Sequence, residues 1–191
     1  MQNNTALKTF VIDLIKNNIP STYYYHQEDH TLYVLEKAIE IGNHEKCTAK
    51  EIDLLQAAAL LHDTGFISTY HEHEEESCRL ATIYLPDYGY SATSIKKICG
   101  MIMATKLPQS PKNKLEEILV DADLEYLGTD LAVEQAEKLY REMHSLQPTL
   151  TIAQWNLIQI SFLEQHHYFT PYCKKYKEAQ KKSYLLQLTK L

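Results

Sequence analysis

The stretch YYYHQEDHTLYV, residues 23–34, places two histidines, His26 and His30, four positions apart. Positions four apart on a helix lie on the same face, one turn from each other. Imidazole nitrogens bind transition metals and also transfer protons near neutral pH. The segment therefore has two interpretations: an ordinary polar pair near a helix start, or half of a reactive site whose other residues come from elsewhere in the chain.

A second candidate is the pair His62–Asp63, which follows the most apolar segment of the chain in QAAALLHDTGF. A carboxylate in such surroundings costs free energy unless it is paired or coordinated. Adjacent His and Asp residues at a helix end can point toward one metal ion, one offering nitrogen and the other oxygen. Alternatively, Asp63 caps the turn that follows, with Gly65 completing it. From these residues alone, both interpretations stand.

The third candidate is LEEILVDADLEYLG, which sets Asp121 and Asp123 into an apolar helix. One of them on the buried face would need a cation, whereas two exposed aspartates on a solvent-facing stripe are the alternative. Together with His30 and the pair His62–Asp63, the chain offers two imidazoles, two carboxylates and no sulfur. This ligand set suits one divalent ion of Mn, Fe, Zn, Ni or Mg rather than a thiolate zinc site.

Helices must position these residues, because apolar residues recur at helical spacing along most of the chain. The first apolar segment stops before Ser21, the next ends at Gly42, and Thr48 with Glu51 resembles a capping box that opens a third helix. Further helices are expected at 73–85, 91–104, 113–127, 130–144, 151–166 and 171–189. We predict an all-α fold of about nine helices, in a single compact domain spanning residues 1–191.

Composition excludes several classes of protein. Apolar residues make up 45% of the 191-residue chain, but no apolar run approaches the roughly 20 residues that span a bilayer. The N-terminus lacks the pattern of a signal peptide, so we expect a cytoplasmic protein. Lysine and arginine number 19 against 25 acidic residues, a net charge of −6, which argues against a nucleic-acid surface. We therefore expect neither a membrane nor a nucleic acid as partner.

In this order, and on helices, the three candidates resemble the H…HD…D signature of the HD-domain superfamily of metal-dependent phosphohydrolases. The resemblance covers residues 23–130, and helices from 131–191 are expected to pack on this core. Within that superfamily, YHQEDHTLYV is similar to the YHNxxHxxxV pattern of cyclic-nucleotide phosphodiesterases, with Gln27 in place of the usual asparagine.

The resemblance implies roles for the individual residues. The ligands of one divalent ion would be His30, His62, Asp63 and Asp123. His26 would be the general acid that protonates the leaving oxygen, and Asp63 would count among the catalytic residues. The ion would lower the pKa of a bound water toward about 7. Asp121 remains an alternative ligand, or a residue that contacts the ligands without binding the ion itself.

The segment YHEHEEESCRLA resembles the HExxS segment that often follows the HD pair, with His73, Glu74 and Ser77 matching. Two-metal members of the superfamily bind a second ion through histidines here and on the next helix. This chain has Thr105 and Lys106 at those later positions, so we expect one tightly held ion. His73 and Glu74 would contact water, substrate or a weakly held second ion. An acidic, solvated helix start, stabilised by the helix dipole, is the alternative.

Lys106 is a candidate contact for the phosphate of the substrate, with an exposed surface cation as the alternative. These observations together predict a metal-dependent phosphohydrolase that cleaves a small phosphate ester, first of all a nucleotide or cyclic nucleotide. The YHxxxH match favours a diester, and a monoester remains open. One alternative is a catalytically weak HD-fold module that binds or senses a nucleotide, and another is a helical interaction protein without metal. All four residues of the H…HD…D signature are present, which favours the enzyme over both alternatives.

Overall fold

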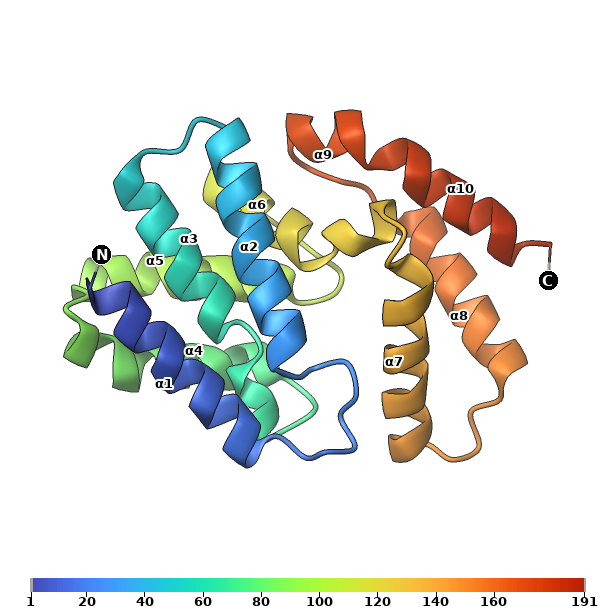
Figure 1. Ribbon diagram of the computed structural model, residues 1–191, viewed down its shortest axis with the longest axis horizontal. Helices are drawn as coiled ribbons and strands as arrows, with labels where there is room; N and C mark the ends of the chain where they lie inside the picture. The colour runs from blue at the N-terminus through green and yellow to red at the C-terminus, as the bar shows by residue number, and fades with distance from the viewer. Residues whose placement is uncertain (1, 191) are drawn as a thin grey trace.

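Helices build the entire fold (Figure 1). The computed structural model describes residues 2–190, and this part of the chain contains α-helices and short 3-10 helices but no strand. The α-helices are α1 (Gln2–Asn18), α2 (Glu28–His44), α3 (Ala49–Leu61), α4 (His73–Tyr84), α5 (Ala92–Thr105), α6 (Lys114–Asp123), α7 (Ala132–Leu146), α8 (Ile152–Gln165), α9 (Pro171–Tyr176) and α10 (Glu178–Leu188). The 3-10 helices are η1 (Thr64–Ile67), η2 (Leu85–Tyr88) and η3 (Glu125–Gly128). The predicted all-α fold is confirmed.

Three helices differ from the sequence-based expectation. The expected helix 113–127 ends at Asp123 and is followed by η3. Helix α2 was expected to end at Gly42 but continues to His44. Gly42 serves packing inside the helix instead, because a Cβ there would come within 2.7 Å of Ile52 Cδ1 on α3. The expected helix 171–189 is divided at Lys177 into α9 and α10. A Cβ on Gly128 would come within 2.5 Å of the Lys177 carbonyl oxygen, so glycine permits this close backbone contact.

Helix α3 lies at the centre of the larger hydrophobic core. Its segment Ala57–Leu61 is completely or almost completely buried, because α1, α2, α5 and α6 all pack against the helix. A capping box between Thr48 and Glu51 begins the helix, as the sequence predicts. A smaller core, which includes Tyr126, Leu163 and Tyr184, joins the C-terminal helices to η3. No helix within residues 2–190 combines the length and apolar character that crossing a membrane requires.

Asp121 anchors the C-terminal helices to α6. Its completely buried carboxylate accepts hydrogen bonds from the backbone N–H groups of Phe169, at 2.9 Å, and Thr170, at 2.8 Å. The Thr170 hydroxyl donates a third bond at 2.6 Å and also caps α9 by accepting from the N–H of Cys173. Tyr168 also donates to backbone carbonyls at the start of η3, so the segment FLEQHHYFTPY, residues 162–172, serves packing.

We expect the substitution Asp121→Ala to lower the free energy of unfolding by about 3 kcal/mol, because it leaves three buried donors without their acceptor. Urea denaturation followed by far-ultraviolet circular dichroism measures the change. Asp87→Ala, at an exposed aspartate on η2, is the matched control and should leave stability unchanged. A loss below about 1 kcal/mol at Asp121 would show that the anchor contributes little to folding.

Candidate metal centre

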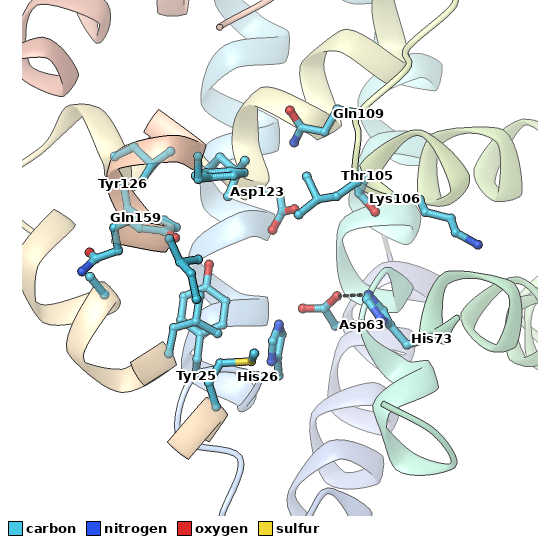
Figure 2. Close-up of a pocket in the computed structure, with 18 of the residues that line it drawn as sticks. Tyr25, His26, Asp63, His73, Thr105, Lys106, Gln109, Asp123, Tyr126 and Gln159 are labelled. Atoms are coloured by element: carbon cyan, nitrogen blue, oxygen red, sulfur yellow. Dashed lines mark ion pairs between the residues drawn. The ribbon is translucent and has the colours of Figure 1, made fainter. Parts of the chain in front are cut away.

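Three helix ends bring the candidate ligands together. His30 lies in the first turn of α2, the pair His62–Asp63 follows the last residue of α3, and Asp123 is the last residue of α6. Helix α2 packs against both α3 and α6, so the three ends meet at one side of the bundle. Figure 2 shows Asp63 and Asp123 pointing into a shared cavity.

The facing atoms of these side chains lie within a few ångströms of each other. Nε2 of His30 is 3.1 Å from Oδ1 of Asp123 and 3.4 Å from Oδ2 of Asp63. Nε2 of His62 is 3.1 Å from Oδ2 of Asp63 and 3.5 Å from Oδ1 of Asp123. His30, His62 and Asp123 offer ligand atoms that all lie within 4.8 Å of one another. These three ligand atoms therefore surround one point, and Asp63 lies beside them through its contacts with both imidazoles.

The donor set fits a divalent ion. Nδ1 of His62 lies 2.8 Å from the carbonyl oxygen of Ala59, so it must donate its hydrogen there. In the neutral ring, Nε2 then carries a lone pair that faces the carboxylates. This nitrogen and Oδ2 of Asp63 are both buried, and neither has a hydrogen-bond partner among residues 2–190. Buried polar atoms are seldom left unpaired, and coordination of one cation would satisfy both.

The two carboxylates are held in the ionised form. Burial disfavours the charge on Asp63, but the neighbouring imidazoles of His62 and His30 outweigh it and hold the pKa of this carboxyl well below its usual range. At Asp123 burial likewise disfavours the charge, but the same two imidazoles lower the pKa of this carboxyl to about 2. Two fixed negative charges therefore face His30 and His62. A divalent cation can balance them in place of protons on the rings.

Asp63 does not cap the following turn. Although it occupies the N-cap position of η1, its side chain makes no capping hydrogen bond. Gly65 instead permits a close approach of α4: a Cβ there would come within 1.9 Å of the carbonyl oxygen of His73. Its N–H donates to the hydroxyl of Ser77 at 2.8 Å. This contact brings Nε2 of His73 to 3.5 Å from Oδ1 of Asp63.

His26 lies beside the centre and is held by a residue that the sequence reasoning missed. Its Nδ1 is 2.5 Å from Oε1 of Glu142, on α7. Oε2 of the same completely buried carboxylate accepts hydrogen bonds from the backbone N–H groups of Tyr25 and His26. Burial disfavours its ionisation, but the contact with His26 lowers the pKa of Glu142. The His26 ring also stacks on Phe66 at a centroid distance of 3.9 Å.

The segment HEHEEES contributes two side chains to the cavity. His73 stacks on the Phe66 ring at 3.9 Å, and its Nε2 is 3.6 Å from Oε1 of the buried Glu74. This arrangement differs from an acidic, fully solvated helix start. Lys106 lines the cavity as well, but its ammonium group forms an ion pair with Glu75 and is partly exposed. Asp121 contacts none of these groups and is part of the C-terminal anchor instead.

One cavity of about 480 Å³ extends from the metal centre. Near the centre it is lined by His26, Asp63, His73 and Asp123. Its other part lies among η3, α7 and α8, with apolar and aromatic side chains on its walls. Figure 2 shows how residues from distant parts of the chain, such as Tyr25 and Gln159, face the same space. The volume suits a small organic ligand.

Comparison with known proteins identifies a shared domain and fold. The HD domain family matches residues 28–148, which include all four candidate ligands and also Glu142, whereas His26 precedes the matched range. A predicted HD superfamily hydrolase from an uncultured Thermotogales bacterium has a similar structure, with a TM-score of 0.65 and 21% identity over 95% of this chain and 88% of its own.

A second solved structure, of a protein from Lactobacillus plantarum, has a TM-score of 0.69 and 16% identity over 99% of this chain and 96% of its own. Among curated proteins, none matches the sequence. At these identities the two structures are evidence for the fold, and the family match covers well over half of the chain.

Proposed function

The chain belongs to the HD domain family, and from this premise we propose that it is a metal-dependent phosphohydrolase acting on a small phosphate ester. The observation that carries the proposal is the convergence of His30, His62 and Asp123, together with the buried, unpaired Oδ2 of Asp63 beside both imidazoles. These residues would hold one divalent ion of Mn, Fe, Zn, Ni or Mg. His73, which contacts Asp63, and Glu74 would contact substrate or a weakly held second ion.

When bound, the ion would supply a water of lowered pKa and offset negative charge on the phosphorus centre. The chain's own residues would do the rest. His26 lines the cavity with its ring centroid 6.1 Å from that of His30, so it can reach a substrate held at the centre. We assign it the role of general acid toward the leaving oxygen. Glu142 would fix the orientation of the ring through Nδ1, which leaves Nε2 for the proton transfer.

The surroundings of His26 support this assignment. Stacking on Phe66 and the bond to Glu142 restrict the ring, while 13% of the side chain remains exposed to the cavity side. A general acid needs such a fixed position, because proton transfer requires hydrogen-bond distance to the leaving group. The resemblance to cyclic-nucleotide phosphodiesterases suggests nucleotides, with diesters favoured over monoesters, whereas the apolar walls of the cavity favour a less polar organic group. Both classes of ester therefore belong in the test.

A panel of phosphate esters tests the proposed function. The full chain, loaded in turn with Mn²⁺, Fe²⁺, Zn²⁺, Ni²⁺ and Mg²⁺, is assayed with nucleoside monophosphates, cyclic nucleotides, alkyl phosphates, and p-nitrophenyl mono- and diesters. We expect hydrolysis of at least one class, and none after removal of the ion with a chelator. Stoichiometric metal without hydrolysis of any ester would favour a module that binds or senses its ligand. Absence of tightly bound metal would contradict the proposal as a whole.

A further inference from the structure

We propose that the substrate carries a single phosphoryl group joined to an apolar organic group, and that this group binds in a hydrophobic lobe of the cavity. The inference rests on the proposed function, because it names the substrate class of the same site. We define the apolar lobe by six residues on η3, α7 and α8: Leu127, Ala136, Leu139, Trp155, Phe162 and Leu163.

The apolar lobe is continuous with the metal centre. Asp63, Asp123 and His26 line the same cavity as Trp155 and Phe162. In Figure 2, Asp63 and His26 lie on one side of the cavity and Tyr126 and Gln159 on the other. A phosphoryl group held at the metal centre would therefore direct its organic substituent toward the lobe. Burial of that substituent against aromatic and aliphatic side chains would supply binding free energy in proportion to its apolar area.

The polar side chains beside the lobe are already paired with each other. Oε1 of Gln159 accepts from the hydroxyl of Tyr184 at 2.8 Å, and its Nε2 donates to Oδ1 of Asn156 at 3.3 Å. The rings of Tyr25 and Tyr126 contact each other edge to face, with centroids 5.9 Å apart. Sugar hydroxyls or the edge of a nucleobase would lose water there without gaining free partners, and such unpaired polar groups cost affinity. The lobe therefore disfavours nucleosides and sugars.

The charges around the cavity favour one phosphoryl group rather than several. Within residues 2–190, the cavity lining includes a single ammonium group, Lys106, and no guanidinium. Lys106 is already paired with Glu75. The lining also includes Glu72 and Glu74 in addition to the two candidate ligand aspartates. A second or third phosphate would meet these carboxylates with only the imidazoles of His71 and His73 as further cationic partners, which is unfavourable.

Gln109 offers one neutral donor for the polar end of the substrate. Its side chain lines the cavity, and its buried Nε2 has no hydrogen-bond partner among the described residues. A phosphoryl oxygen could accept this hydrogen bond without adding charge to the site. A buried donor of this kind, left unpaired, otherwise destabilises the fold. The single unpaired donor of Gln109 agrees with a ligand that is polar at one end only.

Non-hydrolysable phosphonates test the inference independently of turnover. Methyl-, butyl- and hexylphosphonate, together with adenosine monophosphate, are titrated by calorimetry into the full chain loaded with Mn²⁺. We expect hexylphosphonate to bind roughly a hundredfold more tightly than methylphosphonate, because each buried methylene strengthens binding. Adenosine monophosphate should bind no more tightly than butylphosphonate. Equal affinity along the phosphonate series, or tighter binding of the nucleotide than of hexylphosphonate, would overturn the inference.

Two variants, each with a matched control, test whether the dependence of affinity on alkyl chain length arises in the apolar lobe. Ile158, on α8 like three residues of the lobe, lines the same cavity and is 48% exposed. Its neighbour Leu157 is 67% exposed and does not line the cavity. Ile158→Gln should weaken hexylphosphonate binding about fivefold with little effect on methylphosphonate, and Leu157→Gln should change neither. Ala136→Phe fills the lobe and should remove most of the chain-length dependence. Val133→Phe, at an exposed position of the same helix, is its control. Equal effects within each pair would contradict the assignment.

Ester hydrolysis and phosphonate binding test the two proposals, the phosphohydrolase function and the apolar lobe, separately. Hydrolysis of phosphate esters without chain-length dependence of phosphonate binding would leave the proposed function standing and overturn the apolar lobe. Chain-length dependence without hydrolysis of any ester would support the lobe as a binding site and contradict the enzymatic function.

Discussion

Replacement of Asp63 by alanine is expected to abolish stable metal binding and to lower turnover by at least about a thousandfold. Oδ2 of Asp63 lies within 3.4 Å of Nε2 in both His30 and His62, so its removal takes away the carboxylate shared by the two imidazoles. The loss should exceed the roughly tenfold to hundredfold effects of partners that only orient metal ligands. Elemental analysis after dialysis against Mn²⁺, together with the rate on the best ester of the panel, measures it.

Asp87→Ala is the control for this experiment, because Asp87 is an exposed aspartate on η2 and does not line the cavity. Near-ultraviolet circular dichroism establishes that each variant retains tertiary packing. If Asp63→Ala retains a full equivalent of metal at unchanged affinity, the centre does not lie between the helix ends described here. Loss of metal with unchanged turnover would instead show that hydrolysis occurs without the ion.

The substitution His26→Ala is expected to retain metal and to lower turnover by a factor of about 10² to 10⁴, the usual contribution of a positioned general acid. The loss should depend on the leaving group. An ester of an alkyl alcohol needs protonation of the departing oxygen, whereas p-nitrophenolate leaves without it. We therefore expect the full effect on an alkyl ester and a much smaller effect on the matching p-nitrophenyl ester.

His44→Ala serves as the control, since His44 is exposed and stacks on Tyr172, outside the cavity. Loss of metal together with turnover in His26→Ala would assign His26 to the ion rather than to the leaving group. An equal loss on both esters would exclude proton donation as its role.

Glu142→Gln extends the test to the residue that positions His26. The amide keeps the shape of the side chain but removes the charge that faces Nδ1 of His26 at 2.5 Å. We expect a loss of about thirtyfold, below that of His26→Ala, with the same dependence on the leaving group. A loss that does not distinguish the two esters would point to a purely structural role for Glu142.

Sequence periodicity was informative about the helices and about which residue types could form a site. The capping box at Thr48 and the apolar segment before His62 are local features, so they predict α3 without knowledge of its neighbours. The candidate ligands were equally visible as ionisable residues within apolar segments, where isolated charges are costly. Periodicity alone left Asp121 and Asp123 as alternatives. The structure separates them, because Asp121 bonds to the segment that begins α9.

Glu142 shows what the sequence did not reveal. The one indication of its role in the sequence was that this acidic residue lies beside the apolar Leu139 and Met143, on the side of α7 that faces the cavity. Nothing local relates that position to His26, which is 116 residues away in the chain. The apolar lobe is similar: taken alone, Ala136 on α7 and Trp155 and Phe162 on α8 have the pattern of ordinary core residues.

The amino-acid sequence by itself determined the all-α class, the helix starts set by capping residues, and a donor set of imidazoles and carboxylates suited to a divalent ion. Only the tertiary structure decided which of these groups meet, that α7 holds His26 through Glu142, and that the space beside the centre is apolar. The physical reason is that helical periodicity encodes which face of a helix is buried. Which buried face packs against which depends on the shapes of side chains far apart in the chain.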